Sequence, residues 1–193
     1  GAKKIASAMT PVTVGLLGAG AASVKFASDY NESLNKVQVA FGDSAGEVES
    51  FAKTTLDAFG IAEGSALDMA ALFGDMATSM GLTQGEASSM STSLVGLAGD
   101  LASFKNIGLD EAMTALNGIF TGETESLKQI GVVMTQTNLD AYALANGFGK
   151  TTSEMTQAEQ VQLRYQYVLN ATKNAQGDFA NTADGTANSM RTA

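Results

Sequence analysis

A short helix-start pattern constrains the fold of this chain more than any other feature of its sequence. A serine or threonine followed three positions later by glutamate precedes an apolar periodic run at Ser44–Glu47, Thr83–Glu86 and Thr156–Glu159. In such a capping box the hydroxyl accepts a hydrogen bond from the third helical N–H, and the glutamate accepts one from the amide of the capping residue. Each copy therefore predicts the first turn of a helix.

The composition also favours helices. Alanine, leucine and methionine are abundant, proline occurs only at Pro11, and tryptophan is absent. The first three residue types lose little side-chain entropy in a helix. Glycine lies mostly where an apolar run should end, as at Gly42, Gly60 and Gly81, and it commonly follows the last helical residue. We therefore predict an all-α fold, a multi-helix array or bundle of Gly-terminated amphipathic helices with no sheet.

Apolar spacings of three and four locate the helices. They are predicted at residues 11–41, 48–59, 66–80, 87–104, 110–120, 138–145 and 157–176, with a further helical turn through Leu127 and Ile130. The chain divides into a Gly/Ala-rich helical lead-in at 1–28, a helical core at 29–176 and a polar C-terminal tail at 177–193, which we expect to continue into a longer protein. Residues 131–134 are the only local candidate for extended backbone. The heptad spacing of residues 87–104 covers about two and a half repeats, which favours a helix packed on its neighbours over a free-standing coiled coil.

Several classes of function are disfavoured by what the chain lacks. Its net charge is −9 and its lysines and arginines are scattered singly, so no patch for nucleic-acid phosphates is expected. Cysteine and histidine are absent, which removes zinc clusters, thiol nucleophiles and the commonest general base. Acidic residues such as Asp178 and Asp184 follow no calcium-loop pattern, and we assign them to a solvated face. We therefore expect no enzyme activity and no catalytic, cofactor-binding or metal residue.

Three short motifs are weighed against structural roles. Gly42–Gly46 fits Gly-x-Ser-x-Gly, in which Ser44 would be a hydrolase nucleophile at a strand-to-helix turn. That mechanism needs a histidine to accept the serine proton, so a helix end followed by a cap is favoured.

Val12–Ala22 is the most apolar run but only about half the ~20 residues of a membrane helix, so a membrane-active or signal-like segment is the weaker alternative. Gly18–Gly20 favours close helix packing over a phosphate-binding loop.

Four blocks in a fixed order form a longer pattern, which is more specific than any single motif. They are Gly108–Leu116, Ile119–Met134, Ala158–Tyr165 and Ala175–Ala180. Together with Asn31–Gln38, they resemble the N-terminal core of the tail tape-measure proteins of long-tailed bacteriophages and prophages. The resemblance extends from about Asp29 to Met190, and its most distinctive strings are Phe-Thr-Gly-Glu-Thr-Glu-Ser-Leu-Lys and Gln-Gly-Asp-Phe-Ala.

The resemblance implies a structural protein. A tape-measure protein is very long and mostly helical, and it sets the length of the tail tube. The implied partners are other copies of itself, tail assembly chaperones, and tail-tube and tail-tip proteins. Direct nucleic-acid binding by this segment is not implied, and membrane contact would belong only to the full-length protein. The implied location is the host cytoplasm before assembly and the virion tail lumen afterwards, from which the protein is released ahead of the DNA. This segment lacks the long heptads or membrane-spanning stretches of a ruler region, so it would direct assembly rather than measure.

The predicted helix at 157–176 is apolar on two sides, and we name it as the candidate contact surface. Val161, Tyr165 and Val168 lie on one side, Leu163 and Tyr167 lie on the other, and Phe179 follows in the tail. A helix that is apolar on two sides needs partners on both. Two alternatives remain open: an interface with other copies or tail components, or a central helix covered within the chain by residues 108–130 and the N-terminal helices.

Overall fold

The computed structural model describes residues 20–182, with side chains from residue 27, and its regular structure in this range is entirely helical. The α-helices are α1 (Gly20–Phe41), α2 (Ala45–Ala52), α3 (Thr55–Phe59), α4 (Glu63–Ser79), α5 (Gln84–Lys105), α6 (Leu109–Leu116), α7 (Gly118–Thr121), α8 (Thr124–Gln129), α9 (Gln136–Ala145), α10 (Gln157–Ala171) and α11 (Asp178–Thr182). The 3-10 turns η1 (Gly42–Ser44) and η2 (Thr152–Glu154) connect some of them. No strand lies between residues 20 and 182, so the all-α prediction is confirmed there. Predictions for residues 1–19 and 183–193 lie outside the described residues.

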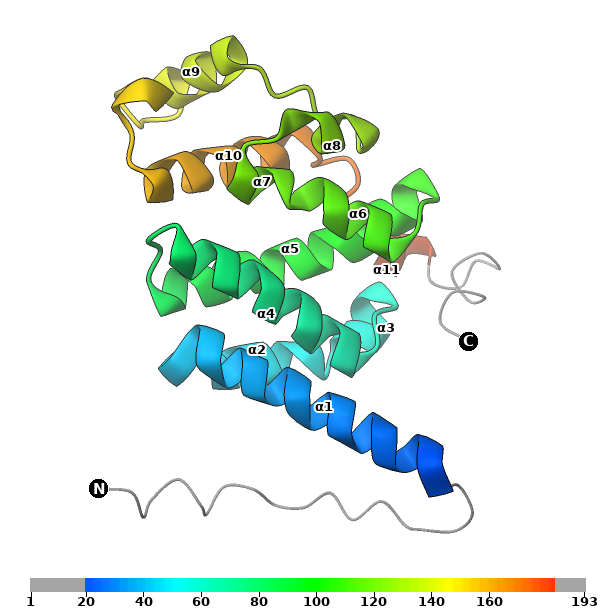
Figure 1. Cartoon of the computed structure of the whole chain (residues 1–193). Coiled ribbons are helices and arrows are strands. Elements are labelled where there is room, and N and C mark those ends of the chain that lie inside the picture. The colour runs from blue at the N-terminus through cyan, green and yellow to red at the C-terminus, as the bar shows by residue number, and fades with distance from the viewer. Residues whose placement is uncertain (1–19, 183–193) are drawn as a thin grey trace, which may run out of the picture.

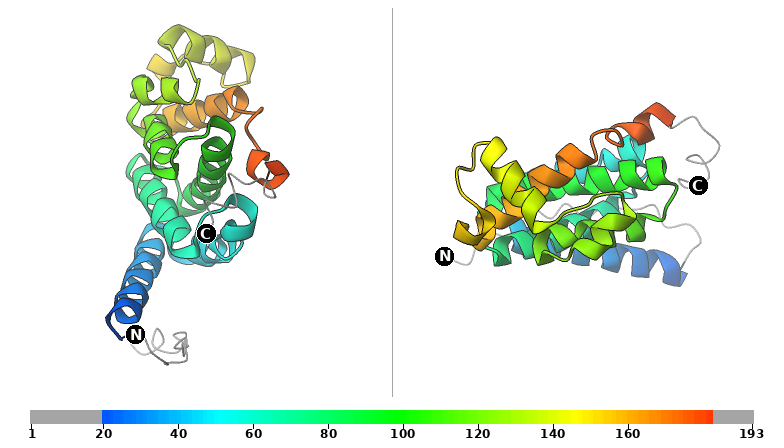
Figure 2. Two further views of the ribbon diagram at one scale, coloured as in Figure 1. Left: turned by 90° about the vertical axis from the view of Figure 1, so that its right-hand side faces the viewer. Right: turned by 90° about the horizontal axis from the view of Figure 1, so that it is seen from above.

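The helices are stacked along the long direction of the molecule (Figure 1). α1 forms one end and packs on α4, α4 packs on α5, α6 packs on α5, and α9 with α10 forms the other end. α2 and α3 cover a further side of α5, and α11 lies against α5 and α3. The N-terminal end of α1 extends past the other helices (Figure 2).

α5 is the central helix, because α1, α2, α3, α4, α6 and α11 all contact it. The predicted heptad residues from Ala87 to Leu101 are buried, whereas Phe104 at the end of that seam is 46% exposed. Small residues on the other faces of α5, including Gly96 and Gly99, are buried as well. The position at the centre of the array therefore belongs to α5 and not to the helix that begins at residue 157.

Two helix crossings depend on glycines inside helices, although the sequence pattern placed glycines mainly at helix ends. A Cβ at Gly74 in α4 would lie 2.2 Å from Cζ of Phe41, the last residue of α1. A Cβ at Gly99 in α5 would lie 2.7 Å from Cβ of Phe59 and 2.9 Å from its carbonyl oxygen. Non-bonded carbon atoms do not approach so closely. These glycines therefore allow α1 to cross α4, and α3 to cross α5, at short range.

The helix starts predicted at the three boxes are confirmed, because α2, α5 and α10 begin directly after Ser44, Thr83 and Thr156. The predicted capping bonds form at two of them. The N–H of Thr83 donates to Oε2 of Glu86 at 2.9 Å, and the N–H of Glu86 donates to Oγ1 of Thr83 at 3.3 Å. Thr156 and Glu159 make the same two bonds at 2.8 and 3.3 Å. A further box at Thr151–Glu154, on η2, was not predicted although it has the same sequence pattern.

Ser44 does not form the predicted capping box. Its backbone is helical, with φ −88° and ψ 0°, and its side chain makes no capping hydrogen bond. An N-cap residue needs extended backbone so that its hydroxyl can reach the amides of the next turn. Ser44 instead ends η1 and continues with helical angles into α2, so its hydroxyl cannot serve this purpose.

The helix predicted at residues 48–59 is divided into α2 and α3. Oγ1 of Thr55 donates to the carbonyl oxygen of Ala52 and to that of Ile61, both at 2.8 Å. The hydroxyl of Thr55 thus ties the start of α3 to the end of α2 and to the residue after Gly60. The helix predicted at residues 110–120 is likewise divided into α6 and α7.

Candidate functional site

The side chains predicted as a contact surface pack inside this chain. Val161, Leu163 and Val168 on α10 are buried, Tyr165 and Tyr167 are half-buried against the core, and Phe179 on α11 is buried. α10 contacts both α7 and α9, so its two apolar stripes find partners within the chain. α10 is also shorter than predicted, because it ends at Ala171 rather than at Gln176. Internal packing is therefore the alternative that this structure describes for the predicted surface.

Tyr167 shows how the second stripe of α10 is used. Its ring meets the ring of Tyr142 on α9 edge-on, with the ring centroids 5.4 Å apart. Its hydroxyl donates to the carbonyl oxygen of Val133 at 2.8 Å. Tyr167 thus holds residues 131–134, which form no strand, against α10.

Arg164 joins the second and third blocks of the pattern that resembles tape-measure proteins. Its half-buried guanidinium donates to the carbonyl oxygens of Ile119 and Phe120 at 3.3 and 3.4 Å, and to Oε1 of Gln160 at 2.9 Å. The two carbonyls belong to α7, which is followed by Gly122 in the left-handed conformation, and a positive charge near helical carbonyls is favourable. Burial lowers the pKa of Arg164, yet a guanidinium stays protonated in proteins. Its role in this structure is to fix α7 to α10.

The fourth block is held to the central helix by a group of residues that we call the α11 joint: Asp100, Ser103, Gly177, Asp178 and Phe179. Oδ2 of Asp100 accepts the N–H of Gly177 at 2.7 Å, and its Oδ1 accepts the N–H of Phe179 at 3.2 Å. Oγ of Ser103 donates to Oδ2 of Asp178 at 2.6 Å. Asp178 is half-buried in this joint, so its assignment to a solvated face is wrong.

Asp100 is a buried carboxylate, with 5% of its surface exposed. Burial raises the pKa of the Asp100 carboxyl above its ordinary value, the two backbone hydrogen bonds lower it, and the nearby Asp178 raises it. A signal for Asp100 was present in the sequence, because it is the only charged residue between Ala87 and Phe104. An isolated acidic residue on an otherwise uncharged buried helix indicates a specific partner, and that partner proved to be the backbone before and within α11.

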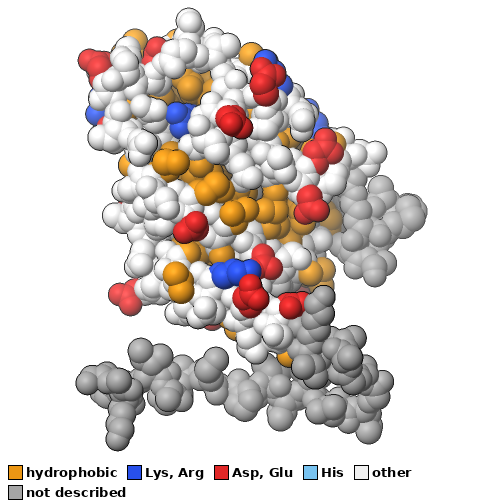
Figure 3. Space-filling model, viewed as in Figure 1, with side chains coloured by type: hydrophobic (Ala, Val, Ile, Leu, Met, Phe, Trp, Pro, Cys, Tyr) orange, Lys and Arg blue, Asp and Glu red, His pale blue; other side chains and the backbone are white. Residues whose placement is uncertain are grey.

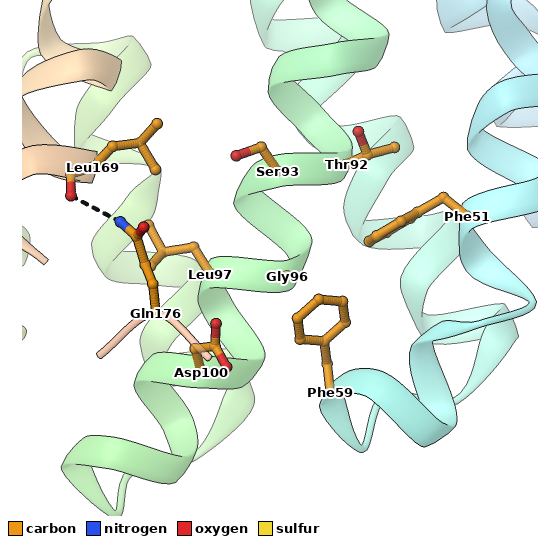
Figure 4. A pocket seen from close by; sticks show the side chains of 9 residues that line it. All are labelled: Phe51, Phe59, Thr92, Ser93, Gly96, Leu97, Asp100, Leu169 and Gln176. Atoms are coloured by element: carbon orange, nitrogen blue, oxygen red, sulfur yellow. Dashed lines mark hydrogen bonds between the residues drawn. The ribbon is translucent and has the colours of Figure 1, made fainter. Parts of the chain in front are cut away.

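Two hollows flank the α11 joint. The larger one, which we call the α5 groove, has a volume of about 440 Å³. It runs along α5, with Phe51 and Phe59 on one side and Leu169 and Gln176 on the other (Figure 4). The smaller one, which we call the Phe179 cavity, has a volume of about 260 Å³. It is lined by Phe59, Gly60, Ile61, Gly99, Ala102, Ile107, Gly108, Leu109 and Phe179.

Three polar side chains along the α5 groove, those of Thr92, Gln176 and Asp100, bond within the chain. Oγ1 of Thr92 donates to the carbonyl oxygen of Ser88 at 3.0 Å, and Nε2 of Gln176 donates to that of Leu169 at 2.8 Å (Figure 4). Asp100 is engaged by the α11 joint. Between residues 20 and 182 no cluster of three or more acidic residues could hold a metal ion. The apolar side chains of Phe51, Phe59, Leu97 and Leu169 line this groove, which makes it a candidate contact surface.

Apolar side chains also reach the surface away from the groove. Among residues 27–182, the large ones that are exposed are Val39, Leu56, Leu72, Phe104, Val133 and Leu144. On the face shown in Figure 3, apolar side chains gather over α4, α6 and α7. Contiguous apolar surface of this kind commonly marks contact sites. This face is therefore a second candidate for contacts with other proteins.

Two alternatives from the sequence remain, a hydrolase that uses Ser44 and a membrane-active segment at Val12–Ala22. Ser44 lies in η1 between two helices, without the preceding strand of a nucleophile elbow. Most of Val12–Ala22 lies outside the described residues, and between residues 20 and 182 no helix combines the length and the apolar character of a membrane span. No protein-family model, curated protein or solved structure matches this chain.

Proposed function

We propose that this chain is a structural segment of a phage tail tape-measure protein, and that it directs tail assembly through helix contacts without enzymatic activity. It would act in the host cytoplasm before assembly and in the tail lumen afterwards. Its partners would be other copies of itself, tail assembly chaperones, and tail-tube and tail-tip proteins. Other parts of the full-length protein would then set the length of the tube.

The observation that best supports this proposal is the position of the blocks that carry the resemblance. Residues 119–134 and 158–165 meet where Arg164 bonds the carbonyls of α7. Residues 175–180 are held by Asp100 and Ser103 of α5. The most distinctive strings of the sequence thus hold helices together. Residues used in this way are constrained by packing rather than by reaction chemistry, as suits a protein that works by contact.

The charge of the chain also supports this proposal. A tape-measure protein leaves the tail ahead of the DNA, so it should not bind the DNA. Binding of DNA depends largely on neutralising phosphates with lysine and arginine, and the net charge of this chain is −9. A chain with a net negative charge repels the DNA backbone, so this chain would not bind the DNA.

The proposal can be tested in the strain whose phage or prophage encodes the chain. The codons for residues 29–176 are deleted in frame, and tails in the lysate are counted and measured by electron microscopy. We expect tails to disappear, because the segment that chaperones and tail components contact is missing, and we expect the wild-type gene supplied in trans to restore them. Tails of normal number and length after the deletion would refute the proposal.

A matched point variant separates the structural role from catalysis. Ser44→Ala removes the hydroxyl of the Gly42–Gly46 motif, and Ser44 makes no capping bond that the change could break. We expect this variant to assemble tails of normal number and length. Loss of tails together with loss of an esterase activity in Ser44→Ala would favour the hydrolase alternative instead.

A further inference from the structure

We propose that Asn146–Gly147 is a site of spontaneous deamidation, at which the side-chain amide of Asn146 is replaced by a carboxylate. The sequence contains two Asn-Gly pairs, Asn117–Gly118 and Asn146–Gly147. Asparagine is one of the chemically labile residues of proteins, and a glycine after it leaves the peptide nitrogen uncovered because glycine has no Cβ. The fold exposes one pair and protects the other. This inference does not depend on the proposed tail function.

The reaction needs only water as a co-reactant. The backbone nitrogen of Gly147 gives its proton to hydroxide and attacks Cγ of Asn146, so that an N–Cγ bond forms. The Cγ–Nδ2 bond then breaks, and Nδ2 leaves as ammonia with a proton taken from water. Water next adds to either carbonyl carbon of the cyclic imide and opens the ring. The product at residue 146 is aspartate or isoaspartate, and no atom is oxidised or reduced.

The peptide group that joins Asn146 to Gly147 is free to turn. No group in the described part of the chain accepts the N–H of Gly147 or donates to the carbonyl oxygen of Asn146. Both residues are exposed, and a Cβ at Gly147 would meet no atom within 4 Å. Ring closure requires the reacting atoms to approach to about 3–3.5 Å in a suitable orientation. This peptide group can reach that orientation without displacing a neighbour.

The backbone on both sides of the pair stays anchored during such a turn. The N–H of Asn146 donates to the carbonyl oxygen of Tyr142 at 3.0 Å, and the N–H of Phe148 donates to that of Ala143 at 3.1 Å. Gly147 has φ 84°, and glycine takes left- and right-handed angles with similar ease. The ring can therefore close while α9 remains folded.

Asn117–Gly118 consists of the same two residue types in a closed setting. Asn117 has helical angles, with φ −57° and ψ −26°, and its carbonyl oxygen accepts the N–H groups of Phe120 and Thr121 at 3.0 and 3.2 Å. Gly118 is buried, and a Cβ there would lie 2.4 Å from the carbonyl oxygen of Glu123. A turn of this peptide group would break both hydrogen bonds in a space that is already filled. The fold therefore prevents ring closure at Asn117.

Deamidation changes the end of α9. Asn146 is the C-cap of this helix, and its Nδ2 donates to the carbonyl oxygen of Tyr142 at 2.8 Å. A carboxylate has no such donor, and its negative charge beside a helix C-terminus is unfavourable. Isoaspartate would also lengthen the backbone between α9 and η2. We therefore expect the last turn of α9 to open more often in the modified chain.

Peptide mapping of the purified full chain tests the proposal. The chain is incubated at mildly alkaline pH, in buffer and in parallel in concentrated guanidinium chloride, and samples are digested with trypsin at intervals. The two pairs then lie in separate peptides, residues 106–128 and 129–150, and mass spectrometry measures the conversion of each asparagine to its acid. In buffer we expect Asn146 to convert many-fold faster than Asn117. In guanidinium chloride the two rates should become similar, because the fold no longer distinguishes the pairs. Equal rates in buffer, or a conversion of Asn146 that is many-fold slower in buffer than in guanidinium chloride, would overturn the proposal.

Two variants complete the test. Asn146→Gln keeps an amide but requires a larger ring, so the conversion in peptide 129–150 should disappear. A conversion that persists in this variant would belong to another residue and would overturn the assignment to Asn146. Asn146→Asp reproduces one product directly, and it should speed hydrogen exchange of the α9 amides relative to the fresh wild-type chain, since exchange reports local opening. Identical exchange in these two chains would overturn the expected effect on α9.

Discussion

Gly74→Ala tests whether α1 and α4 cross as closely as the structure places them. The added Cβ would lie 2.2 Å from Cζ and 2.4 Å from Cε1 of Phe41. Ordinary carbon contacts begin near 3.5 Å, so the ring would have to move by about 1 Å. Phe41 is completely buried, so its ring has no free space into which it can move.

The expected magnitude follows from two opposing effects. Overpacking of a filled core costs about 1–3 kcal/mol. Replacing glycine by alanine inside a helix returns about 1 kcal/mol of helix propensity. Gly46 in α2 is a matched control, because a Cβ there would meet nothing within 4 Å. Gly74→Ala should therefore be less stable than Gly46→Ala by about 1–3 kcal/mol, the cost of the overpacking alone.

Urea unfolding followed by far-ultraviolet circular dichroism measures this difference. The difference in unfolding free energy is calculated from the two urea midpoints, with the same m-value for both variants. The same substitution is then made together with Phe41→Leu, which removes the ring atoms that the Cβ would strike. In that background the cost of Gly74→Ala should shrink, as a double-mutant cycle between contacting residues requires. Equal stability of Gly74→Ala and Gly46→Ala, or an unchanged cost beside Phe41→Leu, would refute the close crossing.

Three other predictions use the same unfolding measurement. Gly118→Ala should destabilise the chain by about 3 kcal/mol, because its Cβ would lie 2.4 Å from the backbone carbonyl oxygen of Glu123, and a cost near zero would contradict the turn between α7 and α8. Arg164→Met keeps the apolar stem but leaves the α7 carbonyls without their donor, so a loss of about 2 kcal/mol is expected, and an unaltered midpoint would show that water replaces the guanidinium. The hydrogen bond from Lys150, followed by those from the capping threonine, lowers the pKa of Glu159 to about 2 from its ordinary value of 4.5. In the unfolded chain this carboxyl takes up its proton at higher pH than in the folded chain. The stabilisation is therefore complete above pH 4.5 and is lost as the pH falls towards 2. Glu159→Gln should flatten the pH dependence of the free energy of unfolding in this range, and an unchanged dependence would exclude Glu159 as its source.

The sequence predicted best what depends on near neighbours in the chain. The boxes at Thr83 and Thr156 were predictable because both of their hydrogen bonds join residues three positions apart. Ser44 has the same local pattern but not the same geometry, because it ends η1 and its backbone is helical. The local pattern therefore forms a capping box only where the backbone of the capping residue is extended, as it is at Thr83 and Thr156.

The arrangement of the helices was less predictable, because it depends on pairs of residues distant in sequence. α5 holds the centre through small buried residues such as Gly96 and Gly99, which give little apolar contrast between its faces. α10 shows strong apolar stripes, yet it lies nearer one end of the stack (Figure 1). Within the candidate site, Phe179 was predicted as a contact residue, whereas its anchor Asp100 was not. The charge of Asp100 was visible in the sequence, but its distance to the chain at Gly177 was not.

The central claim, that this chain is part of the tape-measure protein of a phage tail, is tested most directly by quantitative mass spectrometry of purified tails. The ratio of peptides from residues 29–176 to the tube protein is measured in intact tails and again after DNA ejection. We predict a low and constant ratio in intact tails, because the tube protein lines the whole tail, and a loss of these peptides after ejection. Absence of the peptides from intact tails, or a ratio unchanged by ejection, would contradict the account.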